Sequence, residues 1–188
     1  MKLKKIRDLM LPLDRYAVVP EESTMLDALY TLEEAQKKLP EDVQPVRSVL
    51  VVDDKKRIIG KLGHLAFLRG LEPKYDQMGD LGTLSRAGWT SNFISSMMTD
   101  MHLWGDTFGD YVNNAKKTQV KTVMHPVEEN IDIDAPLSEA VHKIVMYQTL
   151  SIIVKEGDEV VGILRLADLF NEITTKMLQY VHSEESGE

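Results

Sequence analysis

Arg165 and Asp168 are the two charged residues in an otherwise apolar run, VVGILRLADLF, at residues 160–170. An apolar run of this kind is expected to be buried, so two ionisable side chains near its end need partners or a function. At a helix start, the helix dipole stabilises a carboxylate, which can accept two hydrogen bonds at once. Because the two residues are three apart, they can instead simply pair with each other in solvent. The run therefore presents a candidate binding carboxylate and a candidate ion pair.

No arrangement of residues in the sequence indicates an enzyme. The GxSxG, HExxH, P-loop and GxGxxG motifs are all absent. The chain has no Cys, which excludes disulfides, iron–sulfur clusters, Cys-based zinc sites and a thiol nucleophile. Its five His residues are scattered, and none forms an i, i+4 pair of metal ligands. We therefore expect no catalytic residues, no metal site and no cofactor.

The composition is that of a folded, acidic protein. Of the 188 residues, 43% are hydrophobic and 28% are charged, which is enough apolar material for a core. The net charge of -8 argues against binding to nucleic acid, because no basic face is available to displace counterions. The longest apolar runs are far shorter than the roughly 20 residues that span a bilayer, and a signal peptide is not evident. We expect a cytoplasmic protein that does not contact a membrane.

The elements that position Arg165 and Asp168 occur twice in the chain. The segment that begins IRDLMLPLDRYAVV resembles the later segment that begins VKTVMHPVEENIDI. The matched pairs are Met10 with Met124, Pro12 with Pro126, Ala28 with Ala140, and Gly60 with Gly162. The first copy is longer, mainly in KKLPEDVQPVRS, and loops absorb such insertions at little cost. The chain therefore contains an internal repeat.

Each copy has the same order of expected elements. A short extended segment leads into a helix, which Ser23 or Thr24 can cap in the first copy and which Pro136 can begin in the second. A β-hairpin and a closing helix follow. The expected hairpin strands are 48–52 with 57–62, and 152–154 with 160–164. The unit is therefore β-α-β-β-α, present twice.

This duplicated unit resembles a cystathionine-β-synthase (CBS) domain pair, also called a Bateman module. The resemblance covers about 5–71 and 120–181, and rests on the Met-x-Pro segment, the Leu-x-x-Ala helix and the hairpin with Gly. It implies an α/β fold of the α+β kind, with two βαββα repeats packed pseudo-symmetrically. The expected divisions are a first repeat at 1–71, an insert at 72–119, a second repeat at 120–181 and a disordered acidic tail at 182–188. Another ferredoxin-like pseudo-repeat would give a similar pattern.

The resemblance implies a role for both charged residues. CBS pairs commonly end the last strand with Gly-x-x-Ser/Thr-x-x-Asp, in which the hydroxyl meets phosphate or ribose and the Asp binds the two ribose hydroxyls. Asp168 stands at the ribose position of this pattern. Arg165 replaces the hydroxyl residue, and its guanidinium can bind phosphate instead. In the first copy the equivalent positions are Gly63 and Ala66, so we expect the usable site in the second copy alone.

The resemblance also implies positions for the base of an adenosine ligand. They lie in the Met-x-Pro segment and at the start of the first hairpin strand. In the second copy these positions are Thr122, Val123, Met124, Leu150, Ser151 and Ile152. Most of them would also serve as ordinary core residues, so Ser151 and Thr122 are the more informative candidates. In the first copy, His64 can contact a ligand, although a surface or interface role is favoured.

The insert between the copies has an apolar stripe of its own. Apolar residues recur at steps of three or four, which predicts one amphipathic helix at about 89–112. They are Trp89, Phe93, Met97, Met101, Trp104 and Phe108. The stripe either packs on its own repeats, which we favour, or forms a homodimer surface or a docking face for a partner protein.

Together these features predict a regulatory CBS pair. We expect it to bind an adenosine-containing ligand such as AMP, ADP, ATP or S-adenosylmethionine, to transmit occupancy to a partner, and to form a homodimer. The alternative is a ligand-free scaffold that only mediates association.

Overall fold

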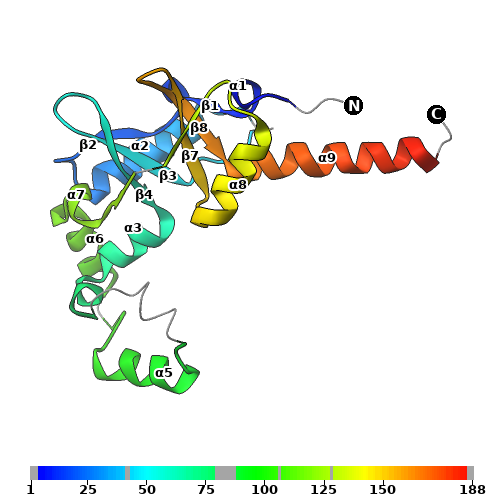
Figure 1. Cartoon of the computed structure of the whole chain (residues 1–188). Coiled ribbons are helices and arrows are strands. Elements are labelled where there is room, and N and C mark those ends of the chain that lie inside the picture. The colour runs from blue at the N-terminus through cyan, green and yellow to red at the C-terminus, as the bar shows by residue number, and fades with distance from the viewer. Residues whose placement is uncertain (1–3, 41–42, 79–87, 106, 128, 186–188) are drawn as a thin grey trace. The chain divides into compact units, whose positions relative to one another are not determined.

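The computed structural model describes residues 4–40, 43–78, 88–105, 107–127 and 129–185 (Figure 1). The chain divides into two compact units, and each is assembled from segments that are distant in sequence. The first unit contains Met1–Tyr16, Ala35–Val46 and Val127–Glu188. The second contains Ala17–Glu34 and Arg47–Pro126. Each unit holds one four-stranded mixed sheet with helices, which confirms the α/β class.

The sheet of the first unit has the strand order β1-β8-β7-β6. Its hairpin consists of β7 (Ser151–Glu156) and β8 (Glu159–Arg165), joined by a turn in which Gly157 has a φ of +61°. The strand β6 (Asn130–Asp132) runs parallel to β7. Helix α8 (Leu137–Tyr147) connects them, and α9 (Leu166–Glu185) follows β8 directly. The predicted hairpin and helices of the second repeat are therefore present.

The sheet of the second unit has the strand order β2-β3-β4-β5. Here β2 (Val18–Pro20) runs parallel to β3 (Ser48–Val52), which pairs with β4 (Ile58–Gly63) in an antiparallel hairpin. Helix α2 (Met25–Lys37) connects β2 to β3, and α3 (His64–Leu71) follows β4. The order of elements is the same as in the first unit.

The two Met-x-Pro segments form short strands that the sequence did not predict. A short helix precedes each strand: α1 (Ile6–Leu9) lies before β1 (Leu11–Pro12), and α7 (Val120–Val123) lies before β5 (His125–Pro126). The strand β1 pairs with β8 of the second repeat, whereas β5 pairs with β4 of the first. Each repeat therefore supplies an edge strand to the sheet of the other.

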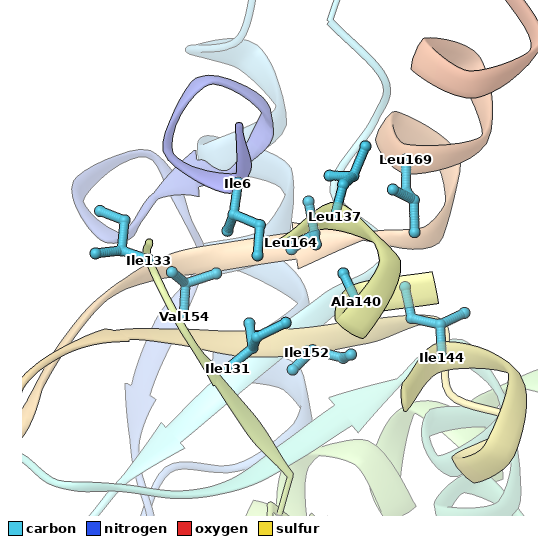
Figure 2. Close-up of a cluster of buried hydrophobic side chains, with 10 residues drawn as sticks. All are labelled: Ile6, Ile131, Ile133, Leu137, Ala140, Ile144, Ile152, Val154, Leu164 and Leu169. Atoms are coloured by element: carbon cyan, nitrogen blue, oxygen red, sulfur yellow. The ribbon is translucent and has the colours of Figure 1, made fainter. Parts of the chain in front are cut away.

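Apolar side chains from several elements form the core of the first unit (Figure 2). Figure 2 shows Ile152 and Val154 of β7, Leu164 of β8 and the helical residues Ala140 and Ile144 in one cluster. Burying one such aliphatic side chain contributes roughly 1.5–3 kcal/mol. Alternation along β7 and β8 places these residues on the face that α8 covers, so this core positions the end of β8.

Thr24 caps the start of α2. Its hydroxyl accepts a hydrogen bond from the backbone N–H of Asp27 at 3.1 Å, and the Asp27 carboxylate accepts one from the N–H of Thr24 at 2.9 Å. The Thr24 hydroxyl, followed by its backbone N–H, lowers the pKa of Asp27 below its usual 3.8. A lowered carboxyl pKa stabilises the fold above pH 3.8, and the contribution is lost as the pH falls through the lowered pKa. Of the two predicted caps, Thr24 is the one used.

Thr24→Ala is expected to lower the free energy of unfolding by about 1 kcal/mol, because α2 loses its capping hydroxyl. Thermal unfolding should show a decrease in Tm of roughly 2–4 °C. Ser23→Ala is the matched control, since the Ser23 hydroxyl has no hydrogen-bond partner among the described residues. Equal losses for both variants would contradict the assignment of the cap.

In the second copy, Pro136 is the residue before α8 and not its first residue.

The predicted single helix at 89–112 is wrong, because the chain turns in the middle of it. Helix α5 covers Ser91–Asp100 and α6 covers Phe108–Lys117. Between them, His102 and Trp104 have positive φ values of 51° and 56°, which end a right-handed helix. The buried carboxylate of Glu72 holds this turn by accepting the backbone N–H of Trp104 at 2.9 Å.

The apolar stripe of the insert is mainly exposed. None of the residues described for α5 is buried, and Phe93 is 51% exposed. At the start of α6, Phe108 is 80% exposed. Trp104 is held by a hydrogen bond from its Nε1 to the Tyr75 hydroxyl at 3.0 Å and by contact with the ring of Tyr111. Packing of the whole stripe on its own repeats is therefore not observed, and a docking role for it stays a prediction.

Among the described residues, no helix combines the length and the apolar character that crossing a membrane requires.

Candidate ligand-binding site

Arg165 and Asp168 lie where β8 ends and α9 begins. Arg165 is the last residue of β8, and Asp168 is in the first turn of α9. No residue separates the strand from the helix, since α9 begins at Leu166, whose N–H donates to the carbonyl of Leu150 just before β7. The carboxylate is therefore placed at the positive end of a helix of 20 residues.

The two side chains form a bidentate ion pair. Arg165 Nη2 donates to Asp168 Oδ1 at 2.8 Å, and Arg165 Nε donates to Asp168 Oδ2. Their side chains are only 9% and 17% exposed. The i, i+3 pairing is therefore present, but it lies in a largely buried position and not in open solvent.

The remaining nitrogen of the guanidinium binds the backbone of a different segment. Arg165 Nη1 donates to the carbonyl of Gln44, and the carbonyl of Pro45 lies 3.5 Å from the same nitrogen. Gln44 and Pro45 belong to Ala35–Val46, which is part of the first unit. Arg165 therefore connects the start of α9 to the segment that precedes β3.

A pocket of about 420 Å³ lies beside this ion pair, entirely within the first unit. The segment from Leu9 to Pro12 forms one part of its wall, and Val43 and Gln44 form another. The first turns of α9 complete it with Arg165 and Asp168. The remaining lining residues are Lys4, Asp8, Arg15, Asn171, Glu172 and Thr175.

Four charged residues of this pocket were not predicted, namely Lys4, Asp8, Arg15 and Glu172. Glu172 is 7% exposed, and its carboxylate accepts the backbone N–H of Lys4 at 3.0 Å while lying 3.8 Å from the Lys4 ammonium. Arg15 is exposed and has no ion-pair partner among the described residues. Glu172 follows Asp168 by one helical turn, so a search along the same face of α9 would have found it. Nothing in the sequence places Arg15 nearby.

The predicted base-binding residues of the hairpin do not line this pocket in the described part of the chain. Ile152 is 1% exposed and belongs to the core, whereas Leu150 is 71% exposed. Ser151 is partly buried and pairs across the hairpin with Arg165.

The other predicted base-binding residues belong to the second unit. Thr122 donates its hydroxyl to the carbonyl of Gln119 at 2.8 Å. The side chains of Val123 and Met124 pack against Gly70 and Gly60. The structure therefore does not bring these residues together with Asp168. Their repeat equivalents, Met10 and its neighbours, lie there instead, because β1 pairs with β8.

The first copy lacks the charged pair, as expected from Gly63 and Ala66. His64 is exposed at the start of α3. The described residues contain no group of three or more His, Asp or Glu side chains that could hold a metal ion.

The CBS-domain family model matches residues 120–175. Residues 120–175 are therefore a CBS domain. None of the curated proteins has a sequence significantly similar to it.

Solved structures of CBS proteins share the fold over nearly the whole chain. The CBS domain of a CBS domain-containing membrane protein from Sphaerobacter thermophilus is 20% identical, with a TM-score of 0.58 over 91% of this chain and 88% of that one. A CBS domain-containing protein from Bacillus anthracis is 13% identical, with a TM-score of 0.61 over 92% and 94%. CBSX2, a CBS-pair protein of Arabidopsis thaliana, has also been crystallised in complex with AMP. That complex is 18% identical, with a TM-score of 0.55 over 92% and 98%.

Proposed function

We propose that the pocket of the first unit binds an adenosine-containing ligand, and that the protein is a non-catalytic regulatory module. The observation that carries the proposal is the Asp168 carboxylate, held at the first turn of α9 in the wall of a 420 Å³ pocket. A neighbour of the same fold crystallised with AMP supports the choice of ligand.

The chemistry of the pocket suits the parts of such a ligand. A carboxylate can accept hydrogen bonds from both hydroxyls of a ribose. Free N–H groups at a helix start favour phosphate, and Arg15 supplies an exposed guanidinium. We assign the base to the space between the Leu9–Pro12 wall and Val43, where apolar side chains and backbone groups are both available.

Regulation would follow from a difference in ligand affinity between two states of the protein. A ligand shifts such an equilibrium only to the extent that it binds one state more tightly. We propose that a partner, or a second copy of the chain in a homodimer, responds to that shift. The exposed face of α5, with Phe93 and Met98, is the proposed place for a protein partner.

A thermal-shift experiment with AMP, ADP, ATP and S-adenosylmethionine tests the ligand. A ligand at 100 times its Kd stabilises the folded state by about 2.7 kcal/mol, which raises the Tm by several degrees. Asp168→Asn should abolish that rise relative to the same variant without ligand. Asp158→Asn, in the exposed hairpin turn of the same unit, should leave it intact. An undiminished rise in Asp168→Asn would place the ligand elsewhere.

The second candidate is a ligand-free scaffold. The observation in its favour is that Asp168 already has a bidentate partner in Arg165. Melting curves that do not respond to any of the adenosine compounds would support this alternative.

A further inference from the structure

Arg165 is a charged side chain that the fold keeps out of water. It is 7% exposed, and among the described residues the other buried polar or charged ones are Ser48, Glu72 and Glu172. Arg cannot lose its proton in a protein, so its charge needs an anion nearby. The anion that the structure provides is the carboxylate of Asp168.

The ligand proposed above needs the same carboxylate. A guanidinium fork uses one lone pair on each carboxylate oxygen, on the side that faces away from the side chain. A chelating ribose diol needs both oxygens from that same side. Ribose binding at Asp168 therefore displaces Nε and Nη2 of Arg165 from the positions they hold in the free protein.

A displaced Arg165 has few other anions nearby with which its guanidinium could pair. Its Nη1 is directed at the carbonyls of Gln44 and Pro45, which are neutral acceptors. Asp8 and Glu172 also line the pocket, but Asp8 accepts the N–H of Lys5 at 3.2 Å, and Glu172 is engaged by Lys4. A ligand that takes Asp168 must therefore supply an anion of its own to the guanidinium.

From this geometry we infer that the site selects adenosine ligands that carry a phosphate, and that Arg165 is the residue that determines this selection. The inference rests on the proposed function and narrows it to nucleotides such as AMP. Adenosine offers the diol but no anion. S-adenosylmethionine carries one carboxylate, but its sulfonium and amino groups leave the molecule with a net positive charge beside Arg165. The formal charges of the pocket residues cancel, so the preference arises from the position of Arg165 and not from a basic pocket.

The replacement of Asp168 by a phosphate as the partner of Arg165 also affects the segment that contains Gln44 and Pro45. When Arg165 turns to a phosphate, the bonds from Nη1 to the Gln44 and Pro45 carbonyls are released. Val46, whose N–H is bound to the Gln36 side chain at 3.1 Å, follows directly and leads into β3. Occupancy of the pocket thereby changes the contacts of the segment that ends at Val46.

Isothermal titration of the full chain with AMP, adenosine and S-adenosylmethionine tests the inference. Wild type should bind AMP more tightly than either other compound by roughly 10- to 100-fold, the value of a charge-assisted hydrogen bond. Arg165→Gln should reduce the preference for AMP over adenosine by about tenfold, with adenosine binding unchanged or tighter because Asp168 is freed. Arg7→Gln is the control, since Arg7 pairs with Asp134 at the surface of the same unit and should leave the AMP preference intact.

The outcomes separate the two proposals. Equal binding of AMP and adenosine to wild type, or an AMP preference that Arg165→Gln does not diminish, overturns the inference but not the proposed ligand site. Absence of binding by all three compounds overturns both. If Arg165→Gln does not fold, Arg15→Gln is the second test, and loss of the AMP preference in that variant overturns the assignment to Arg165.

Discussion

Ile152→Ala is expected to lower the free energy of unfolding of the first unit by about 2–5 kcal/mol. Ile152 is 1% exposed and packs with Val154, Leu164 and Ile144 in the core that Figure 2 shows. Removing its side chain leaves a cavity that a close-packed core fills only in part. Chemical denaturation, followed by circular dichroism, measures the loss.

Leu150→Ala is the matched control, because it removes a similar volume two residues earlier from a side chain that is 71% exposed. Its free energy of unfolding should lie within about 0.5 kcal/mol of wild type. Both residues were candidates for contact with a ligand base. Similar losses for the two variants would show that the hairpin start is packed differently from the structure.

Gly162→Val is expected to destabilise the first unit by about 3 kcal/mol, because β1 and β8 approach each other too closely for a side chain. A Cβ at Gly162 would lie 2.7 Å from the carbonyl oxygen of Leu11 and 3.0 Å from the sulfur of Met10. The strand β1 must then move away from β8, which also opens the wall of the pocket. Thermal unfolding should detect a Tm lowered by roughly 6–12 °C.

Gly63→Val serves as the control for this substitution. A Cβ at Gly63 meets no atom within 4 Å, and its φ of -88° suits any residue. We expect a change of less than about 1 kcal/mol, which includes the weaker capping of α3 by valine. An equally large loss at both positions would indicate a general cost of replacing glycine in these strands and not a clash with β1.

The repeat explains why the sequence predicted the hairpins and helices well. Alternating and helical spacing of apolar residues determines which faces are buried, so β3, β4, β7, β8, α3 and α9 were anticipated. The strands β1 and β5 have two residues each, too few for a pattern to show. Two glycines in the sequence do mark the strands against which β1 and β5 pack. A side chain at Gly60 or Gly162 would need the space that the sulfurs of Met124 and Met10 occupy.

The candidate site was predicted in part, because some of its contacts are local in the sequence. Arg165 and Asp168 stand three apart on one strand-to-helix junction, so local spacing was sufficient to pair them. The contact between Arg165 and Gln44 joins residues 121 positions apart, and spacing carries no information about it. The base-binding positions were assigned from the resemblance to CBS pairs. A resemblance of this kind identifies a position within the repeat but not the copy that supplies it to a given pocket.

In the insert, the prediction of a single helix failed for a different reason. Its apolar residues do recur at helical steps, yet the left-handed conformations of His102 and Trp104 interrupt the helix. The turn depends on the buried carboxylate of Glu72, which precedes Trp104 by 32 positions. A periodic pattern cannot reveal a tertiary contact that overrides local preference.

The reciprocal pairing of β1 with β8 and of β5 with β4 bears on how such a protein can arise. A polypeptide with one repeat would present an unpaired backbone edge together with a free leading strand, and exposed edges promote association. Two identical polypeptides of that kind would satisfy each other by swapping their leading strands. Gene duplication and fusion would then join the two exchanged strands within one polypeptide.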